Sequence, residues 1–490
     1  MTRALKAKPG RSAAQSNALV SGSIPRTLFL FALPTLGSSV LQSLNGSINS
    51  MWVGRYLGEA ALAATSNANM LMFMAFCLIF GFGMAATILV GQRAGAGNAD
   101  GVRRVIGTAQ GLLIPLAVAV SVLGWIFAAA VLKVLGTPPQ SFALAQIYLR
   151  VLLLSMPAGM VLVMLTMALR GVGDAMTPLW AMILVAVLDM GLNPLLILGW
   201  GPVPALGIAG SAIASASANV IGLAALLVYL YRRDISIRLR GREWRYLVPD
   251  WSLVRTIGAK GVPMGMQMIV MALSSLSMLG LVNRQGVVTT AAYGAVMQLW
   301  TYIQMPAMSL GAAVSAMAAQ NIGARRWDRI PRITHSGIAI NIALTGAAVL
   351  VLTLVDRPAL GLFLGADGTA LQTAHHINVI VSWSFILFGV SMVLTSVVRA
   401  NGAVVIPLLM LVVSRIPVQL GLAFALLPRL GADAIWWASA CSAVAALLMS
   451  AAYYRYGRWR EQTMGPPSLI EAEEEALADS NPEGRMQPSG

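Results

Sequence analysis

The chain has 490 residues, of which 58% are hydrophobic and only 10% are charged, and its mean hydropathy is +0.76. A soluble domain carries about a quarter charged residues, so this composition excludes a soluble globular protein. The formal net charge of +15 would suit a nucleic-acid partner. The positions of the basic residues, described below, indicate membrane topology instead, and we expect no nucleic acid to bind.

Apolar stretches long enough to cross a bilayer, which takes about twenty residues, recur along nearly the whole chain. The sequence therefore predicts an all-α polytopic protein with membrane lipid around it. We expect twelve transmembrane helices, over residues 27–53, 60–90, 105–132, 143–169, 177–199, 207–231, 255–283, 288–318, 333–355, 373–398, 404–427 and 433–455.

Basic residues gather on one side of this arrangement. If the amino terminus is cytoplasmic, the inner segments hold 25 Lys and Arg residues, whereas the opposite loops hold five. Multi-span proteins show this excess of basic residues on the cytoplasmic side. Residues 1–26 contain basic side chains and no long apolar run, so we expect no cleavable signal there. We expect both termini in the cytoplasm.

The sequence repeats itself at an offset of 229 residues. This offset aligns Arg170 with Arg399 and Pro178 with Pro407, and an offset one residue shorter aligns Gln92 with Gln320. Each copy contains six expected spans, and an even number gives both copies the same orientation in the membrane. We therefore predict two six-helix lobes related by a pseudo-two-fold axis along the membrane normal.

The repeat also predicts the domain organisation. A site between two such lobes can open to one side at a time when the lobes rock. We expect a cytoplasmic basic segment over 1–26, an N-lobe over 27–231, a cytoplasmic basic linker over 232–254, a C-lobe over 255–460, and an acidic, disordered cytoplasmic tail over 461–490.

One carboxylate lies where an ionised group is costly. Asp189 falls near the middle of the fifth span, whereas the other acidic residues fall in loops, helix ends or tails. A charged residue at that depth costs about 2.5 to 3.5 kcal/mol on insertion scales. A group kept at that cost usually faces a cavity or a partner. The alternative is a protonated carboxyl that hydrogen-bonds Asn45 or Asn49 for packing alone.

Polar side chains are expected to surround Asp189. Asn193 lies one helical turn later, and Pro194 cannot donate a backbone hydrogen bond to the preceding turn. Ser215 in the sixth span is the serine most expected to face the same chamber. These oxygen-rich groups could bind a proton or a small hard cation, with Asn49, Asp189 and Asn193 as the candidate Na⁺ ligands.

The expected substrate cavity combines amide, methionine and aromatic side chains. Amides at spacings of three and four in the first span share one helical face, and the chain has 27 methionines. Soft and aromatic side chains adapt to lipophilic cargo of many shapes. The residues expected to line the cavity are Gln42, Asn45, Asn69, Met297, Gln298, Trp300 and Tyr302.

Several stretches carry a family resemblance. They include SINSMWVGRYLGEAALAA at 47–64, VGQRAGAG at 90–97, RGVGDAMTP at 170–178, NPLLILGWG at 193–201, GIAGSAIAS at 207–215 and AAQNIGA at 318–324. Over all twelve spans the chain resembles the multidrug and toxic compound extrusion (MATE) family, in its bacterial DinF-like branch. The resemblance implies a monomeric antiporter of a bacterial inner membrane. Such a protein would export small lipophilic cationic or aromatic compounds in exchange for H⁺ or Na⁺, with no cofactor.

The sequence departs from the family at the residues that bind the coupling ion. Carried over by motif, two family aspartates fall at Asn49 and Asn193, and an asparagine of the branch falls at Asp189. Ser215 stands where threonine is usual, and a glutamate of another branch falls at Met271. We expect proton coupling through Asp189, with sodium second.

One alternative class remains open, and another is not expected. A flippase for a lipid-linked precursor would need basic residues for its phosphate, and Arg415 is the one good candidate, although it could instead bond carbonyls at a broken helix. An enzyme is not expected, since no intramembrane His, Cys or acidic set has catalytic spacing. The chain has no GxxxxGK[ST] phosphate loop, so ATP is not the expected driver.

Overall fold

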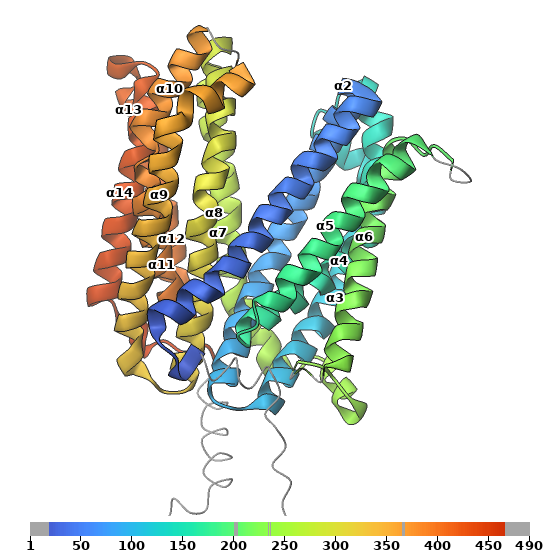
Figure 1. Ribbon diagram of the computed structural model, residues 1–490, viewed down its shortest axis with the longest axis vertical. Coiled ribbons are helices and arrows are strands. Elements are labelled where there is room, and N and C mark those ends of the chain that lie inside the picture. The colour runs from blue at the N-terminus through green and yellow to red at the C-terminus, as the bar shows by residue number, and fades with distance from the viewer. Residues whose placement is uncertain (1–18, 200–203, 234, 236, 365–367, 466–490) are drawn as a thin grey trace, which may run out of the picture.

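The computed structural model describes residues 19–199, 204–233, 235, 237–364 and 368–465. These residues form helices and connecting loops without a strand. Figure 1 shows the helices in two groups, α2 to α6 and α7 to α14, which lie apart at one end of the molecule and together at the other. The predicted two-lobe, all-α fold is confirmed.

The N-lobe consists of five continuous helices that make six spans. The first helix is broken at Gly58, where a φ of 82° and a ψ of −176° interrupt the helical backbone. This left-handed φ is readily adopted by glycine, which has no Cβ, so Gly58 separates the first span from the second. The helices are α2 (Ile24–Gly95), α3 (Ala99–Val134), α4 (Pro139–Gly171), α5 (Met176–Leu198) and α6 (Ile208–Arg232).

The C-lobe repeats this plan with two interrupted spans. α10 and α11 meet at a bend of 42° and form one span, and α12 continues through a π-helical segment, η3, into α13. The helices are α7 (Trp251–Asn283), α8 (Val287–Gly323), α9 (Ile330–Leu364), α10 (Thr369–Val381), α11 (Ser384–Ala400), α12 (Val405–Val413), η3 (Ser414–Leu420), α13 (Gly421–Leu430) and α14 (Asp433–Tyr456).

The described helices account for the twelve predicted spans. Nine helices are long and apolar enough to cross a membrane, or ten when the bent pair counts as one span. One of the nine, α2, supplies two spans because of its break. The twelfth span is α8, which is not among the nine. Its 37 residues make it about 55 Å long at 1.5 Å per residue, long enough to cross a bilayer. Several helices extend beyond the predicted ranges because the polar residues that flank an apolar run continue the helix.

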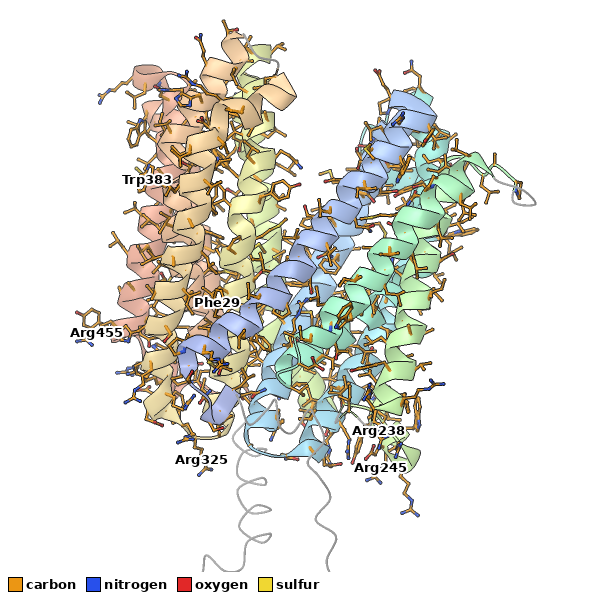
Figure 2. The ribbon with its side chains drawn as sticks, in the orientation of Figure 1. Phe29, Arg238, Arg245, Arg325, Trp383 and Arg455 are labelled. Carbon is orange, nitrogen blue, oxygen red and sulfur yellow. The ribbon has the colours of Figure 1, made fainter. Side chains whose placement is uncertain are left out.

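The basic end is defined here as the end that holds Arg238, Arg245, Arg325 and Arg455, labelled in Figure 2. All four lie at the end where the two lobes come together. The connections between successive spans place the other predicted inner segments there as well. The charge asymmetry read from the sequence therefore becomes an asymmetry between the two ends of the molecule.

Two pseudo-symmetric contacts join the lobes at the basic end. Gln92 Nε2 donates to the Ala400 carbonyl at 2.7 Å, and Gln320 Nε2 donates to the Gly171 carbonyl at 2.8 Å. A glycine lies against the backbone of each glutamine. Gly95 packs on the Gln320 backbone, and Gly323 packs on the Gln92 backbone. These residue pairs are called the basic-end clasp below.

The first helix of the C-lobe, α7, has an N-terminal cap that lies outside its membrane-spanning segment. The Asp250 carboxylate accepts hydrogen bonds from the Ser252 hydroxyl at 2.7 Å and the Ser252 amide at 3.0 Å. The hydroxyl is the main cause that lowers the pKa of Asp250 below its usual value. A lowered pKa in the folded state gives stability that is present above the unfolded pKa and lost as the pH falls through the folded pKa.

We expect Asp250→Ala to lower the free energy of unfolding by about 1 kcal/mol at neutral pH, whereas Asp250→Asn keeps most of the cap. Thermal unfolding of the detergent-solubilised protein measures both. The difference between the native protein and Asp250→Ala should shrink in acid. A difference that grows as the pH falls would contradict this account of the cap.

Candidate functional site

The predicted carboxylate lies inside the N-lobe with two polar partners. Asp189 is 2% exposed, and its Oδ1 accepts hydrogen bonds from Asn193 Nδ2 at 3.0 Å and from Ser215 Oγ at 2.8 Å. Among the described residues, no basic side chain makes an ion pair with it. Asp189 is thus a buried carboxylate held by neutral donors.

Local and tertiary structure each supply one of these partners. Asn193 follows Asp189 by four residues in α5 and also donates to its backbone carbonyl at 3.1 Å. Ser215 comes from α6, which packs closely on α5 because Gly210 lies against the Leu196 backbone where a Cβ would overlap it. A side chain at residue 210 would push Ser215 away from the carboxylate.

Asp189 opens onto a cavity of about 210 Å³ inside the N-lobe. The Asn45 side chain lines the same cavity as the carboxyl group, while Asn45 Oδ1 and Asn193 Oδ1 are buried without a partner. Buried acceptors without donors are rare, so these two oxygens are available to a proton donor or a cation. The cavity is lined by Leu41, Gln42, Asn45, Leu162, Val163, Met182, Val185, Ala186, Asp189, Ser215 and Asn219.

Asn49 belongs to a neighbouring cluster. Its Nδ2 donates to the Tyr148 hydroxyl at 3.3 Å, and its Oδ1 accepts from Ser211 Oγ at 2.8 Å. The Tyr148 hydroxyl is also within hydrogen-bonding reach of Asn69. The described hydrogen bonds therefore bring Asp189 and Asn193 together, whereas Asn49 satisfies its own amide elsewhere.

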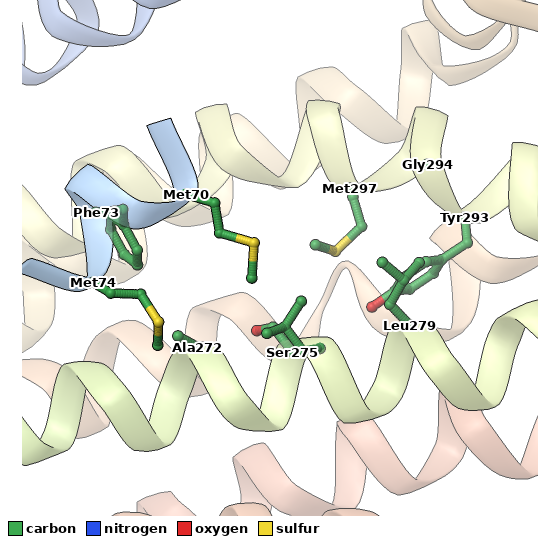
Figure 3. A pocket seen from close by; sticks show the side chains of 10 residues that line it. Met70, Phe73, Met74, Ala272, Ser275, Leu279, Tyr293, Gly294 and Met297 are labelled. Carbon is green, nitrogen blue, oxygen red and sulfur yellow. The ribbon is translucent and has the colours of Figure 1, made fainter. Parts of the chain in front are cut away.

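A second cavity, of about 390 Å³, lies between the lobes and is almost wholly apolar (Figure 3). Met70, Phe73 and Met74 reach it from α2, and Met297 reaches it from α8. α7 and the rest of α8 complete the wall. That wall consists of Ala272, Ser275, Leu276, Leu279, Tyr293 and Gly294.

The expected cavity residues are divided by the structure. Met297 lines the cavity between the lobes, and Gln42 and Asn45 line the Asp189 cavity. Trp300 is instead 5% exposed and packs inside the C-lobe, where its indole N–H donates to Asn378 Oδ1 at 3.2 Å. A buried indole needs such an acceptor. For Asn69, Gln298 and Tyr302, which are exposed side chains outside both cavity linings, contact with cargo stays a prediction.

Sequence reasoning missed two polar residues at the N-lobe site. Tyr148 in α4 contacts Asn49, and Asn219 in α6 lines the Asp189 cavity. Asn219 follows Ser215 by one helical turn and donates to its carbonyl at 2.9 Å, so helical spacing could have found it. Nothing local to α4 marks Tyr148, because its contact spans 99 residues of sequence.

Two six-helix lobes with an apolar cavity between them, and a carboxylate cavity inside one of them, define a polytopic membrane transporter built from parallel repeats. The MatE family model matches residues 34–195 and 263–425, one match in each lobe. The chain belongs to the MatE family. The two matches begin at residues 34 and 263, and these positions differ by the offset of 229 residues found in the internal repeat.

Relatives match nearly the whole chain. This chain is 35% identical over 436 residues to "Probable multidrug resistance protein YoeA" of Bacillus subtilis strain 168. The alignment covers 89% of this chain and 94% of that relative. It is 28% identical over 423 residues to "Probable multidrug resistance protein NorM" of Deinococcus radiodurans, covering 84% and 91%.

A solved structure shares the fold. It is described as "Outward-facing conformation of a multidrug resistance MATE family transporter of the MOP superfamily" and superposes with a TM-score of 0.82 at 18% identity, covering 93% of this chain and 98% of that one. The predicted family and the predicted fold are confirmed.

Proposed function

We propose that this protein is a secondary active multidrug efflux antiporter that exports lipophilic cationic or aromatic compounds in exchange for protons by alternating access. It acts as a monomer in a bacterial inner membrane, with the basic end and both termini in the cytoplasm. Membership of the MatE family and the multidrug resistance names of its relatives support export. The observation that carries the coupling is the buried Asp189 carboxylate beside a cavity.

The neighbours of Asp189 suit both of its protonation states. The carboxylate accepts hydrogen bonds from Ser215 and Asn193, as observed. A protonated carboxyl would instead donate, and the acceptor that we propose for it is Asn45 Oδ1, a buried oxygen without a partner on the same cavity. Because burial disfavours the charged form, each state needs compensating hydrogen bonds. We infer that Ser215 and Asn193 serve the ionised state and that Asn45 serves the protonated state.

The apolar cavity between the lobes suits the body of the cargo. Methionine and phenylalanine side chains from α2 face it (Figure 3), and flexible thioethers repack around different shapes. The Asp189 cavity lies within the N-lobe. The proposed exchange therefore uses two places, a coupling site in one lobe and a cargo cavity between the lobes.

The test is export of a fluorescent cationic dye from proteoliposomes of the full chain, with an imposed proton gradient in one arm and an imposed sodium gradient in the other. We expect export to follow the proton gradient. A rate that follows only the sodium gradient would replace the proton by sodium, for which the unpartnered Asn45 and Asn193 oxygens offer ligands. Absence of export under both gradients would refute the proposed function.

We expect Ser215→Ala to slow proton-driven dye export about ten- to a hundredfold, since the hydroxyl donates to a carboxylate and such a bond contributes about 1.5 to 3 kcal/mol. The initial rate of export measures the effect. Ser217→Ala on the same helix is the control. Equal rates for the two variants would mean that the Ser215 hydrogen bond plays no part in coupling.

A further inference from the structure

The C-lobe holds a guanidinium that the coupling mechanism does not use. Arg415 lies on the π-helical segment η3, inside the eleventh span. Its Nη1 donates to Gln419 Oε1 at 3.0 Å. The same oxygen accepts from Ser274 Oγ at 3.3 Å, and Gln419 Nε2 donates to Ser439 Oγ at 3.1 Å. Arg415 is thus positioned by a polar network that links η3 to α7 and α14.

The Arg415 guanidinium is held by a neutral partner. Among the described residues, Arg415 makes no ion pair, and its one hydrogen bond goes to a neutral amide. Its Nε and Nη2 make no hydrogen bond to the described groups and are not fully buried, since neither is among the buried unpartnered atoms. Two guanidinium donors therefore stay available to a ligand inside a membrane lobe.

The network around Arg415 adjoins the cavity between the lobes. Tyr293 lines that cavity and stacks on Trp436 of α14, the helix that also carries Ser439 of the network. On α7, Ser275 lines the cavity, and the adjacent Ser274 hydrogen-bonds Gln419. Figure 3 shows Ser275 on α7 and Tyr293 on the facing helix α8, with the cavity between the two helices. The apolar cavity therefore has a cationic group behind one wall.

A guanidinium with free donors binds carboxylate and phosphate groups through parallel charge-assisted hydrogen bonds. We propose that Arg415 forms a subsite for the anionic group, a carboxylate or a phosphate, of an amphiphile whose apolar body occupies the cavity lined by α2, α7 and α8. This inference rests on the proposed transport function and widens its substrate class from cations to amphiphilic acids and zwitterions.

The first experiment compares two soluble probes of nearly equal shape, 1-naphthylacetate and the neutral 1-naphthylacetamide. Equilibrium dialysis against the full chain in non-ionic detergent gives both affinities without any ion gradient. We expect the acid to bind about ten- to a hundredfold more tightly than the amide, because it gains hydrogen bonds to a charged group. Equal affinities for the two probes would overturn the proposal without any variant.

Substitutions at residue 415 test whether Arg415 causes the tighter binding of 1-naphthylacetate. Arg415→Gln should reduce the preference for the acid to less than about twofold, and Arg415→Lys should keep part of it because the charge remains. Arg429→Gln, an exposed arginine on the same span, is the control and should keep the full preference. If Arg415→Gln does not fold, Arg415→Lys and the native protein still decide. A full preference in Arg415→Gln would overturn the assignment.

Competition distinguishes two sources of the anion. Displacement of bound 1-naphthylacetate by dihexanoyl phosphatidate, but not by dihexanoyl phosphatidylcholine, would assign the subsite to a lipid phosphate. Displacement by neither lipid would assign it to a soluble amphiphilic acid. Failure of the native protein to export the cationic dye would refute the proposed function alone, since the binding comparison needs no transport.

Discussion

Asp189→Asn is expected to abolish proton-driven dye export while the protein remains folded. The amide has nearly the same shape as the carboxyl group and still accepts a hydrogen bond through its oxygen, but it cannot bind and release a proton. Removing a group that costs about 2.5 to 3.5 kcal/mol to place in the membrane should leave thermal stability unchanged or raised. We expect the initial export rate to fall at least about a hundredfold.

The measurement is the rate of dye export from proteoliposomes under a fixed proton gradient, with thermal unfolding of each variant in detergent. Asp100→Asn is the matched control, because Asp100 is an exposed carboxylate in the first turn of α3. It should export at the native rate. An Asp189→Asn protein that exports at the native rate would show that Asp189 serves packing alone.

The second large effect concerns the basic-end clasp. A Cβ at Gly95 would overlap the Gln320 carbonyl, and a Cβ at Gly323 would overlap the Gln92 carbonyl. Each obstacle is backbone, so a side-chain rotation cannot relieve it, and overpacking costs about 1 to 3 kcal/mol or more. We expect Gly95→Ala together with Gly323→Ala to separate the lobes at the basic end and to lower the export rate at least about tenfold.

Spin labels at residues 133 and 284, both exposed at the end opposite the basic end, report the change in a protein without Cys77 and Cys441. Opening at the basic end in an alternating-access transporter should close the other end, so the distance between the labels should shorten in the doubly substituted protein. Gly159→Ala is the control, because nothing lies near its added Cβ. An unchanged distance distribution in the doubly substituted protein would mean that the clasp does not set the conformation.

Much of the fold could be predicted because the bilayer imposes long apolar runs and the charge bias orders them. The repeat then fixed two lobes from aligned residues such as Arg170 and Arg399. The interruptions were predicted only in part, because a break near Arg415 was considered and Pro417 lies within η3, whereas the bend between α10 and α11 was not expected. The 42° bend between α10 and α11 depends on how that span packs. The π-helical form of η3 also depends on packing, although its polar residues and Pro417 mark a local departure from the apolar pattern.

In the candidate site, too, contacts within one helix could be predicted from the sequence, whereas contacts between helices could not. Asp189 and Asn193 could be paired from the sequence because four residues make one helical turn. The sequence alone could not decide whether Ser215 faces Asp189, since their contact depends on the close packing of α5 and α6. Trp300 was expected to line the cargo cavity but is buried inside the C-lobe against Asn378. A composition rich in methionine and aromatic residues does not say which of them the lobe buries.

Direct detection of proton movement tests the central claim of coupling through Asp189. Proteoliposomes loaded with the cationic dye and a pH indicator, with the membrane potential clamped and no imposed pH gradient, report dye exit and lumenal pH together. We expect dye exit through the native protein to acidify the lumen, and Asp189→Asn to show neither signal. Dye exit through the native protein without acidification would contradict proton exchange.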